Sequence, residues 1–249
     1  MPTIDLNCDM GESYGAWRMG DDDRLMDFVS SVNIACGFHA GDPSTIRRTV
    51  ETAVGKHLKL GAHPSYPDRQ GFGRREMALS AAEIFDFVLY QVAALKGLCE
   101  ALGGRLHHVK PHGALYNDAA KQSEKAAAIA EAVKKIDSEL IVYGLSGSRL
   151  ITEAEKIGLR TASEVFADRT YQPDASLTPR RLENALIEDD RKAVSQVMEM
   201  VFEQRVTALS GEIVPLRAET ICIHGDGPHA VEFARLISSS LTARGVAIQ

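Results

Sequence analysis

Seven short apolar segments recur along the chain, and a segment with helical character separates each from the next. The apolar segments are residues 3–8, 32–36, 58–62, 106–110, 140–143, 160–165 and 220–224. Short apolar runs without polar alternation are typical of strands that are covered on both faces of a parallel sheet. Strands that alternate with helices predict an α/β fold with right-handed crossover connections.

The helical segments carry recognisable start and stop signals. Asp42 and Pro43 suit the N-cap and the first position of a helix that runs to about residue 57. Ser80 and Glu83 have the spacing of a capping box, and this helix should end at residues 103–104, a pair of glycines. Further helices are expected near residues 21–29, 118–136, 148–157, 191–202 and 228–244, and a small hairpin within residues 208–216 turning at Gly211.

Both an open doubly wound sheet and a closed barrel are compatible with this alternation. Polar clusters follow nearly every predicted strand, which favours a barrel that gathers them at one rim. A doubly wound sheet would need polar loops only near its switch point. The length of 249 residues fits one barrel domain over residues 1–249. We therefore expect a (β/α) barrel-like fold with seven strands.

Composition excludes several classes of partner. The formal net charge is −6, and no cluster of Lys and Arg with interleaved aromatic residues occurs, so we expect no nucleic-acid partner. No apolar run reaches the roughly 20 residues that a membrane span needs, and the acidic start lacks the pattern of a signal peptide. We expect a cytoplasmic protein with no membrane partner. The four cysteines show no CxxC spacing and are expected to be buried thiols.

Polar residues capable of acid–base chemistry stand at the ends of the predicted strands. In a closed barrel these positions would face one pocket and supply acids, bases and cationic donors. The candidates are Asn7, Asp9, Glu12, His39, Asp42, His63, Lys110, His112, Glu164, Asp168, His224 and Asp226. Lys110, in an apolar strand end, should point inward, where it could bind a carboxylate or phosphate or stabilise an oxyanion. His108 alternates with Lys110 and its role stays open.

Two long segments interrupt the regular alternation. Residues 64–79 and 166–184 are rich in glycine, proline and charge and lack periodicity. Loops of this length in a compact domain are often lids or binding loops.

Metal and nucleotide binding remain open from the residues alone. His39, His63, His112, His224 and nearby aspartates are suitable ligands for zinc or a similar divalent ion, but no diagnostic spacing such as HExxH occurs. The position four after His39 is Pro43. No GxxxxGK[ST] loop is present, and GFGRRE lies within a predicted lid, so the sequence does not locate a nucleotide site.

Six motifs in collinear order resemble the LamB/YcsF family. They are DLNCDMGE, NIACGFHAGDP, GAHPSYPDRQGFGRR, VKPHGALYN, EVFADRTYQPD and HGD. The resemblance implies cleavage of 5-oxo-L-proline to L-glutamate with ATP as co-substrate, hydrolysed to ADP and phosphate, in a complex with two further subunits, B and C. It also implies a barrel similar to the glycoside hydrolase and deacetylase barrels. Deacetylases of that kind use an Asp with an H-x-x-x-H pair, for which only Asp9 and His39 are comparable here.

In this reading Asp9 or His39 is the general base, His63 and His112 orient water or the leaving group, and Lys110 holds a carboxylate or phosphate. The substrate-binding residues would be Asn7, Glu12, Glu164, Asp168, His224 and Asp226. Two alternatives remain: a metal-dependent carbohydrate N-deacetylase, and a binding subunit that delivers oxoproline without performing chemistry.

Overall fold

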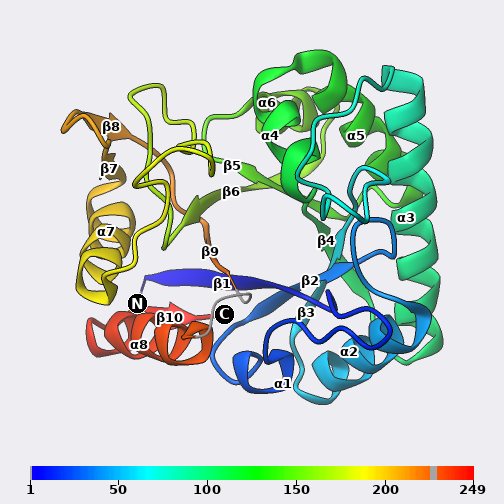
Figure 1. Cartoon of the computed structure of the whole chain (residues 1–249), viewed down its shortest axis with the longest axis horizontal. Coiled ribbons are helices and arrows are strands. Elements are labelled where there is room, and N and C mark those ends of the chain that lie inside the picture. Colours follow the sequence, from blue (N-terminus) through cyan, green and yellow to red (C-terminus); the bar gives the residue numbers. More distant parts are fainter. Residues whose placement is uncertain (1, 225–228) are drawn as a thin grey trace.

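A ring of seven parallel strands forms the centre of the computed structural model, which describes residues 2–224 and 229–249. The strands are β1 (Thr3–Met10), β2 (Ser31–Ala35), β3 (Lys59–His63), β4 (Leu106–Val109), β5 (Ile141–Leu145), β6 (Arg160–Phe166) and β9 (Thr220–Ile223). Strand β9 pairs with both β6 and β1, and this double pairing closes the barrel seen in Figure 1. The predicted strand count and the predicted barrel are confirmed.

Helices surround this ring on its outside (Figure 1). They are α1 (Asp22–Leu25), α2 (Pro43–Gly55), α3 (Ala81–Ala101), α4 (Gly113–Lys121), α5 (Ser123–Ile136), α6 (Arg149–Lys156), α7 (Asp190–Glu203) and α8 (Ala230–Ala243). Among the described residues, none of the helices has both the length and the apolar character that crossing a bilayer requires.

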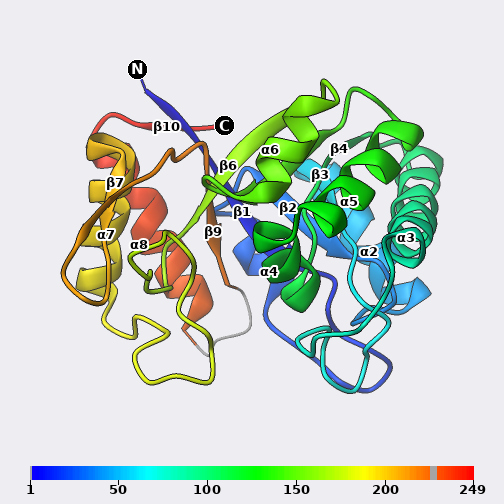
Figure 2. The same ribbon diagram turned by 90° about the horizontal axis from the view of Figure 1, so that it is seen from above.

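Two small strand pairings complete the fold. Strands β7 (Arg205–Thr207) and β8 (Ile213–Pro215) form an antiparallel hairpin, and Gly211 in its loop has a φ of +90°. The predicted hairpin is confirmed, although its first strand begins earlier than expected. Strand β10 (Ala247–Ile248), which was not predicted, pairs with the start of β1. Both ends of the described chain therefore lie at one end of the barrel, opposite the long loops (Figure 2).

Two helix predictions were wrong in their boundaries. The helix expected over residues 118–136 is two helices, because Gln122 adopts an extended conformation (φ −110°, ψ 105°) between α4 and α5. Helix α4 also begins earlier, at Gly113. The helix expected over residues 21–29 is a single short turn that ends at Leu25.

The barrel interior is filled by polar side chains, and the apolar core lies between the strands and the helices. Leu6, Cys8 and Met10 of β1 are fully buried in that apolar core. The alternate residues Asp5, Asn7 and Asp9 instead make hydrogen bonds or ion pairs with polar residues of other strands. Asp5, for example, accepts hydrogen bonds from Ser31 (2.8 Å), Tyr143 (3.2 Å) and Thr220 (2.6 Å). TIM barrels more often fill this space with branched apolar residues.

Asp42 holds the start of helix α2 and ties it to an earlier loop. Its carboxylate accepts hydrogen bonds from the backbone amides of Ser44 and Thr45, both at 2.9 Å, which confirms the predicted N-cap. The same carboxylate accepts from the Gly15 amide at 2.9 Å. These bonds, first that of Gly15, lower the pKa of Asp42 from 3.8 to about 2. The loop that carries His39 is thereby fixed at its downstream end.

The Asp42 cap generates a prediction about stability. Asp42→Ala should cost about 1 kcal/mol of unfolding free energy at pH 7, because three backbone amides lose their acceptor. Since the folded-state pKa is depressed, the carboxylate contributes fully above about pH 4, and its contribution is lost as the pH falls toward 2. Urea unfolding at pH 7 and pH 3 measures both effects. Asp42→Asn is the matched control, because it keeps an acceptor but cannot titrate. An equal deficit of Asp42→Ala at both pH values would contradict this assignment.

Candidate active site

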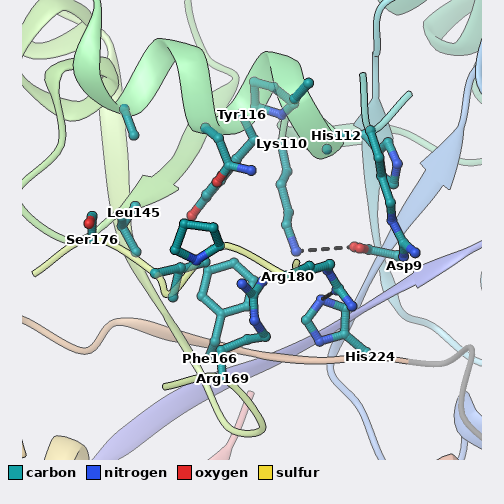
Figure 3. Close-up of a pocket in the computed structure, with 18 of the residues that line it drawn as sticks. Asp9, Lys110, His112, Tyr116, Leu145, Phe166, Arg169, Ser176, Arg180 and His224 are labelled. Carbon is teal, nitrogen blue, oxygen red and sulfur yellow. Dashed lines mark hydrogen bonds and ion pairs between the residues drawn. The ribbon is translucent and has the colours of Figure 1, made fainter. Parts of the chain in front are cut away.

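Lys110 occupies the centre of the polar network at the carboxyl ends of the strands. Its ammonium lies 2.8 Å from Glu164 Oε1 and 3.1 Å from Asp9 Oδ1, and it donates to Asn7 Oδ1 at 3.0 Å. Figure 3 shows the side chain extending toward Asp9. Burial disfavours the ammonium, but the charges of Asp9 and Glu164 outweigh that effect and hold the pKa of Lys110 well above its usual value. Lys110 is therefore a fixed cation that joins β1, β4 and β6.

Cys222 on β9 also contacts this cation, with Sγ 3.0 Å from Lys110 Nζ. The sequence predicted only buried thiols, and this contact with a lysine was missed. Burial nevertheless raises the pKa of Cys222 well above its usual value, although Lys110 acts in the opposite direction. The residue is a thiol at neutral pH. Cys8 and Cys99 are buried free thiols as expected, whereas Cys36 is only half-buried, and burial raises the pKa of all three.

A second group of polar side chains holds Asn7 and Asp9, two of the residues that contact Lys110. Asn33 donates to Asn7 Oδ1 at 2.7 Å and to Asp9 Oδ1 at 2.9 Å. The Oδ1 atom of Asn33 lies 2.8 Å from His108 Nε2, which must donate this hydrogen bond. The His108 ring stacks on Tyr143 with centroids 4.0 Å apart. His108, left open by sequence reasoning, thus lies inside the barrel and orients the amide beneath Asp9.

His63 and His112 meet Asp9 and Glu12 beside this network. His63 Nε2 lies 3.2 Å from Asp9 Oδ2 and 3.0 Å from His112 Nδ1. His112 Nδ1 lies 3.8 Å from Glu12 Oε1. The four side chains come from the ends of β1 and β3 and from the N-cap of α4. Their ligand atoms all lie within 4.8 Å of one another, which is close enough to surround one metal ion. His63 contacts Asp9, whereas the comparison with deacetylases had pointed to His39.

The charge states in this cluster follow from its burial and its neighbours. Burial alone would raise the pKa of Asp9, but the nearby His63 and Lys110 hold it well below its usual value. Burial, together with the neighbouring imidazoles, lowers the pKa of His112 well below its usual value. At neutral pH Asp9 is a carboxylate and His112 is uncharged.

His39 lies behind the cluster. Only 1% of its surface is exposed, and its ring stacks on that of His112 with centroids 3.9 Å apart and planes 5° from parallel. Its Nε2 atom lies 3.5 Å from Glu12 Oε1. Neither ring nitrogen makes a hydrogen bond within the described part of the chain. Burial, followed by the neighbouring His63, lowers the pKa of His39 well below its usual value. The neutral His39 ring is placed to hold His112 and Glu12 in position.

A cavity of about 540 Å³ opens onto this cluster. Six of the predicted site residues line it, namely Asp9, Glu12, His63, Lys110, His112 and His224. Four others lie behind that lining within the described chain, and these are Asn7, His39, Glu164 and Asp168. Asp226 falls outside the described residues. The structure thus brings together side chains from six strand ends, but only some of these side chains line the cavity and could contact a ligand.

Arginine side chains also line the cavity, and sequence reasoning did not identify them. Arg169 and Arg180 from the loop after β6 line the cavity (Figure 3). Arg74 from the loop after β3 lines it as well. Both loops were expected to be lids or binding loops, and both line the cavity. The only sequence signal for these arginines was their place in a charged, aperiodic loop.

A relay of hydrogen bonds orients Arg180. His224 Nδ1 lies 2.8 Å from the Asp168 carboxylate, and His224 Nε2 lies 2.7 Å from Arg180 Nη2. Because arginine can only donate, Nε2 accepts and Nδ1–H donates to Asp168. Burial opposes ionisation of Asp168, but the facing His224 and Arg180 hold its pKa below the usual value. Asp168 and His224 therefore fix the direction of a guanidinium group at the cavity wall.

At the level of the fold, the chain is a deacetylase-like barrel. A mutant of the peptidoglycan deacetylase PdaC from Bacillus subtilis superposes with a TM-score of 0.50 and 13% identity, covering 99% of this chain and 86% of that one. That likeness concerns the fold alone. The LamB/YcsF family profile matches residues 4–249, and the chain belongs to this family.

Two close relatives cover nearly the whole chain. The A subunit of 5-oxoprolinase from Tolumonas auensis is 59% identical over 100% of this chain and 99% of its own length. The crystal structure of the lactam utilization protein from Thermus thermophilus has a TM-score of 0.93 and 46% identity, with 99% of each chain covered. The expected family membership is confirmed.

The position of the His108 ring against Gly61 generates a prediction about stability. A side chain at Gly61 on β3 would overlap the His108 ring, which is hydrogen-bonded and stacked. Gly61→Ala should cost about 1–3 kcal/mol of unfolding free energy in urea denaturation, because His108 must move or the backbone must shift. Gly97→Ala is the control: it lies in helix α3 with no atom within 4 Å of the new Cβ, and it should raise stability by about 1 kcal/mol. Equal stability of Gly61→Ala and the wild type would show that His108 is not held there.

Proposed function

We propose that this chain is the A subunit of an ATP-dependent 5-oxoprolinase of the cytoplasm. With subunits B and C it would cleave 5-oxo-L-proline to L-glutamate, coupled to hydrolysis of ATP to ADP and phosphate. The names of its close relatives support this proposal. The observation that carries it is a cavity lined both by a buried, paired ammonium and by an oriented guanidinium group.

The ammonium and the guanidinium groups that line the cavity match the two polar ends of 5-oxoproline. The substrate has a carboxylate, for which a guanidinium group is a planar bidentate partner. Arg180 and Arg169 line the cavity and would bind that carboxylate. Burial, followed by the charge of Arg180, lowers the pKa of Arg169 to about 10, so Arg169 remains cationic at neutral pH. The lactam oxygen would then face Lys110, where negative charge develops during the reaction.

The proposed chemistry uses ATP to activate a resistant amide. Phosphorylation of the lactam oxygen makes the ring carbon a better electrophile. Water then adds to that carbon, the C–N bond breaks as the nitrogen takes a proton, and the resulting acyl phosphate is hydrolysed to glutamate and phosphate. As water adds, the electron pair of the C–N π bond moves to the nitrogen, and Lys110 would stabilise the negative charge on the oxygens of the attached phosphoryl group. Asp9 and Glu164 hold Lys110 charged for this role, so Lys110 serves as a cation and not as a base.

The remaining residues are assigned by their place around the cavity. His63 and His112 line it and would orient the attacking water, and Glu12 lies beside them. His39, Asn7 and Glu164 lie behind the lining and are positioning residues in this proposal. Asp168 and His224 hold Arg180. Asp226, outside the described residues, stays a prediction from the sequence. ATP is the co-substrate of the assembled complex.

An assay of glutamate release from 5-oxoproline and ATP tests the proposal. The mixture of this chain with its B and C partners should release glutamate, and the chain alone should not. Lys110→Met should lower kcat of the mixture by at least about 100-fold, the usual effect of removing an oxyanion donor. Lys96→Ala, which removes an ammonium on the outer helix α3 that pairs with Glu100, is the matched control and should keep the wild-type rate.

Circular dichroism and co-purification with the partners show whether Lys110→Met still folds and assembles. A folded, assembled Lys110→Met complex with the wild-type kcat would contradict the assignment of Lys110. A rise in KM at unchanged kcat would instead favour a subunit that only binds and delivers 5-oxoproline.

A further inference from the structure

The orientation of two imidazole rings in the cavity is set by backbone carbonyl groups. His63 Nδ1 lies 2.6 Å from the carbonyl oxygen of Lys110, and His112 Nε2 lies 2.8 Å from that of Phe72. A carbonyl oxygen can only accept a hydrogen bond, so each of these nitrogens carries the proton. Where each ring carries only that proton, the other nitrogens, His63 Nε2 and His112 Nδ1, present lone pairs.

These two lone pairs point at each other and at two carboxylates. The two nitrogens are 3.0 Å apart, Asp9 Oδ2 lies 3.2 Å from the first, and Glu12 Oε1 lies 3.8 Å from the second. The other oxygen of Asp9, Oδ1, already accepts hydrogen bonds from Lys110 and Asn33. Four acceptor atoms with no hydrogen between them repel one another. A positive charge at their centre removes that repulsion.

The spacing of the four atoms fits a metal ion. Nitrogen and carboxylate oxygen ligands bind zinc at about 2.0–2.2 Å, so neighbouring ligands lie about 3.0 Å apart in octahedral geometry and about 3.4 Å apart in tetrahedral geometry. The observed separations of 3.0, 3.2 and 3.8 Å are close to these values. Metal-binding histidines also usually donate their second ring N–H to a carbonyl or carboxylate, as both do here.

We propose that Asp9, Glu12, His63 and His112 bind one divalent transition-metal ion, with zinc and manganese the ions best suited to two imidazoles and two carboxylates. All four residues line the cavity, so the ion would keep a coordination position open toward it. The buried His39 ring, which has no hydrogen-bond partner in the described chain, lies against His112 and near Glu12 and would reach a water or ligand group held there. The inference stands apart from the proposed function, because metal content is measured without any assay of turnover.

Metal binding by the purified full chain tests this inference. The protein is stripped with a chelator and titrated with Zn²⁺ or Co²⁺, and bound metal is measured by elemental analysis, calorimetry and the visible absorption of Co²⁺. We expect one ion per chain. His112→Ala and Glu12→Gln should each weaken binding by more than about 10-fold, because each removes a direct ligand. His224→Gln is the control: this cavity histidine already pairs with Asp168 and Arg180, and the variant should keep wild-type affinity.

Circular dichroism separates loss of metal from loss of fold. If His112→Ala does not fold, Glu12→Gln, which keeps the shape of the side chain, still tests the inference. Absence of stoichiometric metal in the wild type would overturn the inference and would mean that a proton on His63 is shared with Asp9 and His112. The inference would also fail if folded His112→Ala and Glu12→Gln bound metal as tightly as the wild type, or if His224→Gln alone abolished binding.

Discussion

The buried ammonium of Lys110 is the interaction on which the arrangement of this site depends. A charge with 2% exposure is tolerated only when it is paired and hydrogen-bonded, and here Asp9 and Glu164 supply the opposite charges from two other strands. Loss of one partner from such a buried pair typically costs about 3–5 kcal/mol. The requirement to neutralise one cation thus fixes the relative positions of β1, β4 and β6 at the rim of the cavity.

Hydrogen bonds among the polar side chains inside the barrel extend this constraint to further residues of the site. Apolar side chains inside a barrel constrain one another by volume, whereas hydrogen-bonding groups also constrain direction. Asn33 is oriented by His108 from below and in turn orients Asp9. Asp9 faces His63, whose tautomer is set by a backbone carbonyl. Each reactive side chain is therefore aimed by a neighbour that is itself fixed.

Much of the fold was readable from the sequence, since buried parallel strands are apolar throughout and helix caps have local signals. The seven strands and the Asp42 cap follow from such patterns. The break at Gln122 could not be predicted, because no glycine or proline marks it and the segment on each side has good helix formers. The start of α4 at Gly113 was also not predicted, because its N-cap residue, His112, makes no side-chain capping hydrogen bond and so gives no sequence signal.

The site was predicted in part for similar reasons. Asn7 and Asp9, two residues apart in a strand, had to share the inner face, so strand ends pointed to the correct cluster. The sequence could not show which of these residues reach the cavity, because the distance of a side chain from the cavity depends on packing. His39, for example, stacks on His112 and does not line the cavity. Arg180 was missed since its position comes from an aperiodic loop and from a partner, His224, far along the chain.

The central claim is that the cavity binds 5-oxoproline with Lys110 at one end of the ligand and Arg169 and Arg180 at the other. A crystal structure of the assembled complex with 5-oxo-L-proline tests it most directly. The account expects the ligand in this cavity, with its carboxylate within hydrogen-bond distance of Arg180 or Arg169 and its lactam oxygen facing Lys110 Nζ. A ligand bound elsewhere, or bound with its carboxylate on Lys110 and its ring directed at the arginines, would contradict the account.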